Sequence, residues 1–311
     1  MSTEPQITAA TEDALRPLLR RRQNRFLSFF KSLLKKPPAA IAFVIIVVMV
    51  FSAVFADVLA PYDPLELHPA ARLKAPMTQS ATEAAPYVLG TDNLGRDVLS
   101  RIMHGARISL WVGILTIIIS QGIGTGLGMV SGYFGRTTDA IIMRVVDAIY
   151  SIPQLILTIA MAAMLGPSTI NVVYAISFTS IPPVTRVIRG ATLSIKQNEY
   201  VTAARALGAS NPRIILNYVL PNVLPLVIVY ISLSFAGTIL AEASLSFLGL
   251  GTPPPTPSWG GMLSSSGRQF FEVAPWLAIW PGIAITMATL SFNLMGDALR
   301  DILDPRMRGA S

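Results

Sequence analysis

Six long apolar runs alternate with polar segments along the chain, and each run is long enough to cross a membrane. At about 1.5 Å per residue, roughly 20 helical residues span the about 30 Å hydrocarbon core of a bilayer. The pattern predicts membrane helices at 39–60, 106–131, 139–165, 170–192, 219–249 and 274–296. We therefore expect an all-α membrane protein with six transmembrane helices.

The polar segments define the other parts of the chain. They predict an N-terminal tail at 1–38, a first transmembrane helix at 39–60, a large loop at 61–105, a five-helix core at 106–296 that includes a polar loop at 193–217, and a C-terminal tail at 297–311. Lys and Arg gather in the N-terminal tail and between Arg186 and Arg213, and such charge favours the cytoplasmic side. Both termini are therefore expected in the cytoplasm and the loop at 61–105 outside. A cleaved signal peptide is the alternative for the first run, but its basic region would be unusually long.

Composition narrows the possible chemistry. The chain has no cysteine and two histidines, His68 and His104, which excludes disulfides and thiolate zinc sites and leaves little for imidazole chemistry. No G-x-x-x-x-G-K-[ST] motif is present to bind ATP, and no G-x-S-x-G motif supports an intramembrane hydrolase. The net charge of +7 lies beside membrane segments, so we expect contact with membrane lipid and not with nucleic acid. We expect neither a cofactor, a metal nor a catalytic activity in this chain.

The polar loop at 193–217 has the pattern of a helix, a tight turn and a second helix. Asn198 can cap a helix that starts at Glu199, and Gly208 can supply the left-handed residue that stops it. Asn211 and Pro212 suit the start of the next helix. A polar, basic loop of this kind between two apolar runs is suited to contact with another protein. The candidate contact residues are Glu199, Tyr200, Ala203, Ala204, Ala206, Gly208 and Ala209.

This loop resembles the coupling-loop signature of ABC importer permeases. The positions that match are Thr202-Ala203-Ala204, Gly208 and Leu220-Pro221; Thr202 stands where the signature has Glu, and Tyr218 where His or Ile is frequent. Four further strings are similar to the C-type permease subunit of dipeptide, oligopeptide and nickel ABC importers. They are LGTDNLGRDVLSR from Leu89, IMRVVDAIYSIPQLIL from Ile142, AEASLSFLGLGTPPPTPSWGGML from Ala241 and NLMGDALRDILDP from Asn293.

The resemblance implies a type I ABC importer permease fold with cytosolic coupling helices, in a bacterial inner membrane. It also implies a second, homologous permease subunit, two cytosolic ATPase subunits that bind ATP and Mg²⁺, and an extracytoplasmic substrate-binding protein. Peptides would be the most frequent cargo in such a family, with glutathione, nickel chelates, opines and oligosaccharides as alternatives. The candidate contact residues of the loop would then couple ATPase closure to movement of the membrane helices.

Two acidic residues lie within predicted membrane spans, where a charge is expensive and often functional. Asp147 lies three residues after Arg144, so we expect an ion pair near the inner end of the third span. Glu242 has no evident local partner; it faces either an aqueous pathway or the second permease, and its neutralisation is expected to impair assembly or transport. The alternative function is a proton-coupled secondary transporter with Asp147 and Glu242 as relay acids, which predicts an inverted repeat and transport by this chain alone.

Glycine, proline and tryptophan mark further features of the predicted spans. The ridge of Gly122, Gly124, Gly126 and Gly128 permits close helix packing. Pro153 and Pro182-Pro183 are expected to interrupt spans, and Trp259 is expected at the membrane interface.

Overall fold

The computed structural model describes residues 33–34, 36–79 and 85–303, and the regular secondary structure of this part is helical, with two isolated β-bridges in the loop before α4 (Val98–Phe134). Most of the N-terminal tail expected at 1–38, and residues 304–311, lie outside the described residues. Within the described residues, four helices are long and apolar enough to cross a membrane: α2 (Pro37–Val54), α4 (Val98–Phe134), the continuous helix Asn211–Phe247, and α12 (Trp276–Leu303). The helix Asn211–Phe247 consists of α9 (Asn211–Ile214), the π-helical turn η2 (Ile215–Val219) and α10 (Leu220–Phe247).

The segment expected as one span at 139–165 is instead two helices. α5 (Arg136–Tyr150) and α6 (Gln154–Leu165) meet at an angle of 83°. Pro153 lies at the break, where its ring and missing N–H disfavour a continuous helix. The predicted span at 139–165 is therefore not one continuous helix, and the interruption expected at Pro153 is confirmed.

α7 (Thr169–Ile195), in contrast, is not interrupted at its prolines. The helix runs without a break through Pro182 and Pro183, which were expected to interrupt it. Membrane helices tolerate proline where neighbouring groups satisfy the freed backbone. α7 also carries Arg186 and Arg189 and is not among the four helices that are both long and apolar enough to be candidate spans. The structure therefore supports four candidate spans, or five if α5 and α6 form one broken span, and the predicted count of six is not confirmed.

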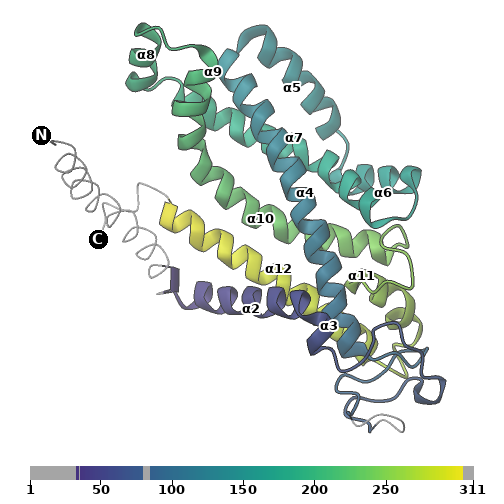
Figure 1. Ribbon diagram of the computed structural model, residues 1–311. Helices are drawn as coiled ribbons and strands as arrows, with labels where there is room; N and C mark the ends of the chain where they lie inside the picture. The colour runs from purple at the N-terminus through teal and green to yellow at the C-terminus, as the bar shows by residue number, and fades with distance from the viewer. Residues whose placement is uncertain (1–32, 35, 80–84, 304–311) are drawn as a thin grey trace, which may run out of the picture.

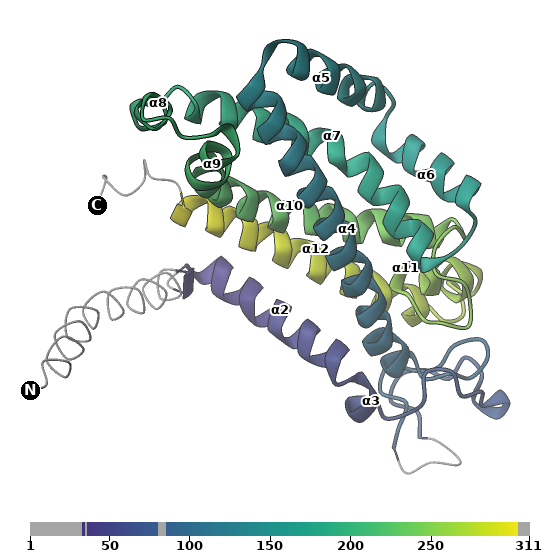
Figure 2. The same ribbon diagram turned by 45° about the horizontal axis from the view of Figure 1, so that its top comes forward.

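The helices form an elongated bundle with different structures at its two ends. α4 runs through the whole bundle, α7 packs along it, and α10, α12 and α2 lie side by side next to them (Figures 1 and 2). The loop that precedes α4 lies at one end, and α8 (Glu199–Ala206) and α9 lie at the other (Figure 1). Lys36 Nζ donates to Asp301 Oδ2 at 2.6 Å, which joins the start of α2 to the end of α12. The short elements are α3 (Ala56–Leu59), η1 (Pro69–Ala71), α11 (Trp259–Met262) and η3 (Leu263–Gly267).

Three glycines on one face of α4 allow α7 to approach closely. A Cβ at Gly124 would lie 2.7 Å from Val184 Cβ, and one at Gly128 would lie 2.8 Å from Thr185 O. Gly132, one turn further, meets Thr192 in the same way. Gly122 and Gly126 face open space. The packing ridge is therefore a stripe with a four-residue spacing, which matches one helix face, and only two of its members were predicted.

The loop before α4 is folded around a buried carboxylate. Asp92 accepts hydrogen bonds from the backbone N–H groups of Leu94 and Arg96 and from Arg96 Nε at 2.7 Å. Asp97 caps α4 by accepting from Ser100 N at 2.7 Å, and burial raises the pKa of the Asp97 carboxyl. α4 therefore begins at Val98, within the segment 61–105 that was predicted to precede the second span.

Trp259 is buried within the chain and not at the membrane interface as expected. Only 2% of its surface is exposed, and its Nε1 donates to the carbonyl of Ile102 at 3.0 Å. Gly105 leaves the space for the indole ring, because a Cβ there would lie 2.9 Å from Trp259 Cδ1. Trp259 thus joins α11 to the N-terminal part of α4.

Candidate functional site

The loop at 193–217 forms a helical segment that we call the coupling segment, residues 196–214. α8 begins at Glu199 and Gly208 adopts φ +83°, so both local predictions are confirmed. The Asn198 side chain makes no cap bond and instead donates to the Tyr200 hydroxyl at 3.2 Å. The second helix begins at Asn211 with Ser210 as its cap, one residue earlier than expected, and it continues into α10.

The coupling segment is attached to the C-terminal ends of α4 and α7. Val201 and Ile214 are fully buried in a cluster that includes Tyr133 on α4. The Tyr133 hydroxyl donates to Asn211 Oδ1 at 2.8 Å, and Lys196 Nζ donates to the carbonyl of Gly132 at 2.6 Å. A force applied to the coupling segment therefore reaches α4, α7 and α10 directly.

The side of the coupling segment that faces away from the bundle is exposed, and several of its residues have small side chains. Among the predicted contact residues, the exposed ones are Glu199, Tyr200, Ala203, Ala206 and Gly208, while Ala209 is half-buried. Ala204 is buried and packs inward, so it is not placed for contact with a partner. Leu207 was not among the predicted contact residues. It is 89% exposed and is the most exposed large apolar residue of the coupling segment. In the sequence, its position directly before Gly208, which ends the helix, could have indicated that it is exposed.

Two ion pairs connect α5 to α7. Arg189 binds both carboxylate oxygens of Asp139, and Arg186 donates to Asp147 Oδ1 at 2.7 Å. The expected pair between Arg144 and Asp147 is therefore wrong, because the partner of Asp147 lies on the neighbouring helix. The Arg186 guanidinium also stacks on the ring of Tyr150, 4.1 Å from its centre.

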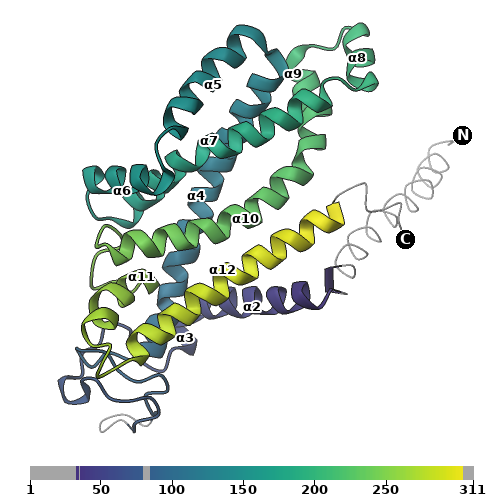
Figure 3. The ribbon, with the colours of Figure 1, turned by 180° about the vertical axis from the view of Figure 1, so that it is seen from behind.

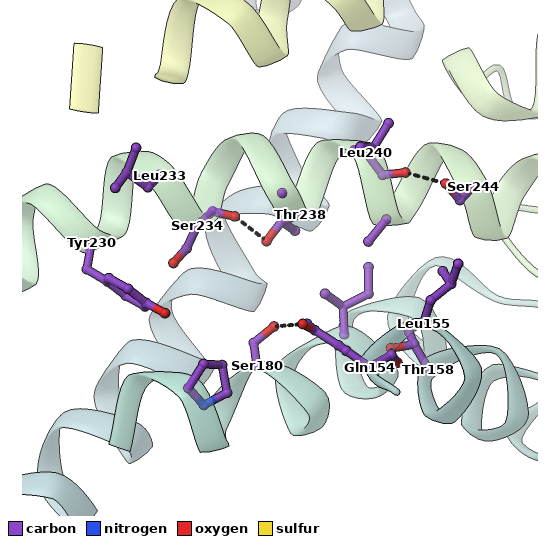
Figure 4. Close-up of a pocket in the computed structure, with 14 residues that line it drawn as sticks. Gln154, Leu155, Thr158, Ser180, Tyr230, Leu233, Ser234, Thr238, Leu240 and Ser244 are labelled. Atoms are coloured by element: carbon purple, nitrogen blue, oxygen red, sulfur yellow. Dashed lines mark hydrogen bonds between the residues drawn. The ribbon is translucent and has the colours of Figure 1, made fainter. Parts of the chain in front are cut away.

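A cavity of about 510 Å³ lies between α6, α7 and α10. Tyr230 and Ser234 on α10 point across it toward Ser180 on α7 and Gln154 on α6 (Figure 4). Gln154 Nε2 donates to Ser180 Oγ at 3.4 Å. The other lining residues are Leu155, Thr158, Ile176, Pro183, Leu233, Gly237, Thr238, Leu240, Ala241 and Ser244. The described residues that line the cavity carry hydroxyl and amide groups but no charge.

Glu242 is buried at the contact of α4 and α10, with 1% of its surface exposed. Its Oε1 accepts from Ser246 Oγ at 2.7 Å and its Oε2 accepts from Ser109 Oγ at 3.0 Å. The expectations that Glu242 lacks a local partner and that it faces a pathway or a second permease are therefore wrong. Within this chain it joins two helices.

This geometry revises the expected effect of substitution at Glu242. Glu242→Gln should leave the unfolding temperature of the purified chain close to that of the wild type, because hydroxyl groups can donate or accept and so can pair with an amide. Glu242→Leu should lower stability by about 1–3 kcal/mol for each buried hydroxyl left unpaired. Thermal unfolding in detergent measures both. Equal stability of the leucine variant and the wild type would contradict the assigned role.

These features define the class of protein: a helical membrane subunit with a coupling segment exposed on one side, an uncharged cavity lined by both apolar and polar side chains, and no nucleotide-binding motif. The profile of the family described as binding-protein-dependent transport system inner membrane component matches residues 124–309. The profile of the N-terminal transmembrane domain of oligopeptide transport permease C matches residues 25–76. The chain belongs to the family of binding-protein-dependent transport system inner membrane components.

Several curated proteins are similar to this chain over most of its length. It is 44% identical to the dipeptide transport system permease protein DppC of Escherichia coli K12, over 91% of this chain and 93% of the relative. It is 41% identical to DppC of Alkalihalophilus pseudofirmus, over 90% of this chain and 89% of the relative. The glutathione transport system permease protein GsiD of Pectobacterium atrosepticum is 39% identical, over 90% of this chain and 91% of the relative.

Family membership establishes the general role of the chain. It is a non-catalytic, multi-pass inner-membrane permease subunit of an ABC importer. A binding-protein-dependent importer implies an ATPase and a substrate-binding protein as partners. The comparisons give no support to the alternative of a proton-coupled transporter.

Proposed function

We propose that this chain forms one half of the translocation pathway of an importer for dipeptides or short oligopeptides. The other half is a homologous second permease, two cytosolic ATPase subunits supply the energy from ATP and Mg²⁺, and an extracytoplasmic protein delivers the cargo. The names of the relatives support peptides as the cargo, since several are dipeptide permeases and one is a glutathione permease. Glutathione is itself a peptide, so the cargo class is shared.

The observation that best supports a coupling role is the combination of an exposed outward side and a rigid attachment in the coupling segment. Ala203, Ala206 and Gly208 have little side chain, so an ATPase groove can approach the backbone closely. Val201 and Ile214 hold the other side of the segment in the bundle. ATPase closure would therefore move α7 and α10, which line the cavity, as one body with the coupling segment.

The orientation that fits this role places the coupling segment and both termini in the cytoplasm. The Lys36–Asp301 bond holds the start of α2 and the end of α12 together, at the same end of the bundle as α8 (Figures 1 and 3). The basic residues Lys196, Arg205 and Arg213 of the coupling segment lie at this end and agree with the positive-inside rule.

The cavity is a candidate part of the pathway. Its hydroxyl and amide groups can bind the N–H and C=O groups that every peptide carries, whatever its side chains. The absence of charge among the described lining residues suits a path that admits peptides of varied sequence.

The test is purification of the complete complex in mild detergent, followed by mass spectrometry of its subunits and by ATPase assay. We expect a second permease, ATPase subunits and a binding protein to co-purify, and ATP hydrolysis to rise when the peptide-loaded binding protein is added. The matched negative control is the same preparation with the binding protein free of peptide. Purification of the chain alone, with uptake driven by a proton gradient in liposomes, would overturn the proposal.

A further inference from the structure

The two ion pairs between α5 and α7 differ in how completely their groups are used. In the Asp139–Arg189 pair, both carboxylate oxygens bind the guanidinium, and Asp139 also accepts from Ser131 Oγ. Its side chains are 19% and 31% exposed for Asp139 and Arg189. This pair is saturated and partly covered, as expected of a structural link between two helices.

The Asp147–Arg186 pair has binding capacity left over. A single hydrogen bond joins its two side chains, which are 54% and 40% exposed for Asp147 and Arg186. A carboxylate has two acceptor oxygens and a guanidinium has five N–H donors. Among the described residues, Asp147 Oδ2 and most of the N–H groups of Arg186 have no protein partner. Tyr150 holds the guanidinium plane in place by stacking.

This pair does not line the neutral cavity itself, but it adjoins lining residues along α7 and across the bend between α5 and α6. Arg186 is one helical turn beyond Pro183 on α7, and Tyr150 is four residues before Gln154 across the bend between α5 and α6; Pro183 and Gln154 both line the cavity. Exposed charge in a membrane segment is expensive against lipid and is normally found facing a water-filled space or a protein partner. The adjoining cavity carries hydroxyl and amide groups, which makes a water-filled space the better interpretation here.

We propose that Asp147 and Arg186 bind the two charged termini of a zwitterionic peptide at the inner end of the cavity. Arg186 pairs with the peptide carboxylate, and Asp147 pairs with the peptide ammonium group. When the peptide binds, it partly replaces the bond between Asp147 and Arg186. Its ammonium and carboxylate groups then act as counter-ions, so neither protein charge is left unpaired. This inference rests on the proposed peptide importer, and it assigns charge recognition to this pair and backbone recognition to the neutral cavity.

The experiment uses the complete complex in proteoliposomes, with dialanine as the probe. The informative variant is Asp147→Asn combined with Arg186→Gln, because the two amides can keep a hydrogen bond between α5 and α7 while both charges are removed. We expect ATP-dependent dialanine uptake to fall about tenfold or more, as for lost hydrogen bonds to charged groups. ATP hydrolysis stimulated by the loaded binding protein, and the unfolding temperature, should stay near wild-type values.

The matched control is Arg144→Gln, which removes an exposed arginine one turn from Asp147 on the same helix. Its uptake should equal that of the wild type. Wild-type uptake by the double variant would show that the pair does not bind the peptide, and an equal loss in the control would show that the effect is not specific to the pair; either result would overturn the inference. Failure of the proposed function is a separate result: the wild-type complex itself would then show no ATP-dependent uptake of dialanine, and the inference would fall with it.

Discussion

Replacing Gly128 by leucine should prevent α4 from packing on α7 and sharply reduce the amount of folded protein. A Cβ at this position would lie 2.8 Å from both Ile188 Cβ and the carbonyl oxygen of Thr185. A backbone oxygen cannot rotate away as a flexible side chain can, so the two helices would have to separate. Overpacking a well-packed contact costs about 1–3 kcal/mol, and a clash with backbone belongs at the upper end of that range.

Gly126→Leu is the matched control for this prediction. Gly126 lies on the same helix two residues earlier, and a Cβ there would meet nothing within 4 Å. Size-exclusion chromatography and thermal unfolding of the purified chain measure the effect. We expect a monodisperse, stable Gly126→Leu protein and an aggregated or strongly destabilised Gly128→Leu protein. Equal behaviour of the two variants would contradict the close contact between α4 and α7.

The pattern of apolar residues predicts most of the fold because helix formation in a membrane is a local property. A long apolar run satisfies its own backbone hydrogen bonds, so α2, α4, α10 and α12 follow directly from the sequence. The break at Pro153 was also expected from the sequence, whereas the unbroken course of α7 through Pro182 was not. Proline removes a hydrogen bond in both places, and the neighbouring helices decide whether the chain then turns.

The coupling segment was largely predictable for the same local reason. The start of α8 and the positive φ of Gly208 depend on residues within one turn. Which side of α8 faces outward depends on tertiary contacts, and the buried Ala204 and exposed Leu207 were therefore not distinguished in advance.

Most partners of the acidic residues could not be predicted because they are distant in the sequence. Arg186 is 39 residues from Asp147, and Ser109 is 133 residues from Glu242. Only the packing of α7 against α5, and of α10 against α4, brings these groups together. Ser246, four residues after Glu242 on the same helix, was the one partner that helical spacing alone could have indicated.

Replacing Leu207 by aspartate should uncouple ATP hydrolysis from transport and leave this chain folded. Leu207 is 89% exposed, so its removal takes no buried apolar contact from the isolated chain. If the coupling segment docks in an ATPase groove as proposed, burial of this leucine contributes about 1.5–3 kcal/mol to docking. An aspartate in its place would also have to lose its hydration, which adds a further penalty. Association with the ATPase subunits should weaken about tenfold or more.

Leu67→Asp is the control for this prediction, since Leu67 is also exposed, at 57%, but lies in the loop at the other end of the bundle. The measurements are the amount of ATPase subunit that co-purifies, the stimulation of ATP hydrolysis by the loaded binding protein, and the unfolding temperature of the isolated chain. Loss of the first two in Leu207→Asp alone, at an unchanged unfolding temperature, is the expected result. Full association and stimulation in Leu207→Asp would mean that the exposed end of α8 does not contact the ATPase. The docking surface would then have to lie on another side of the coupling segment.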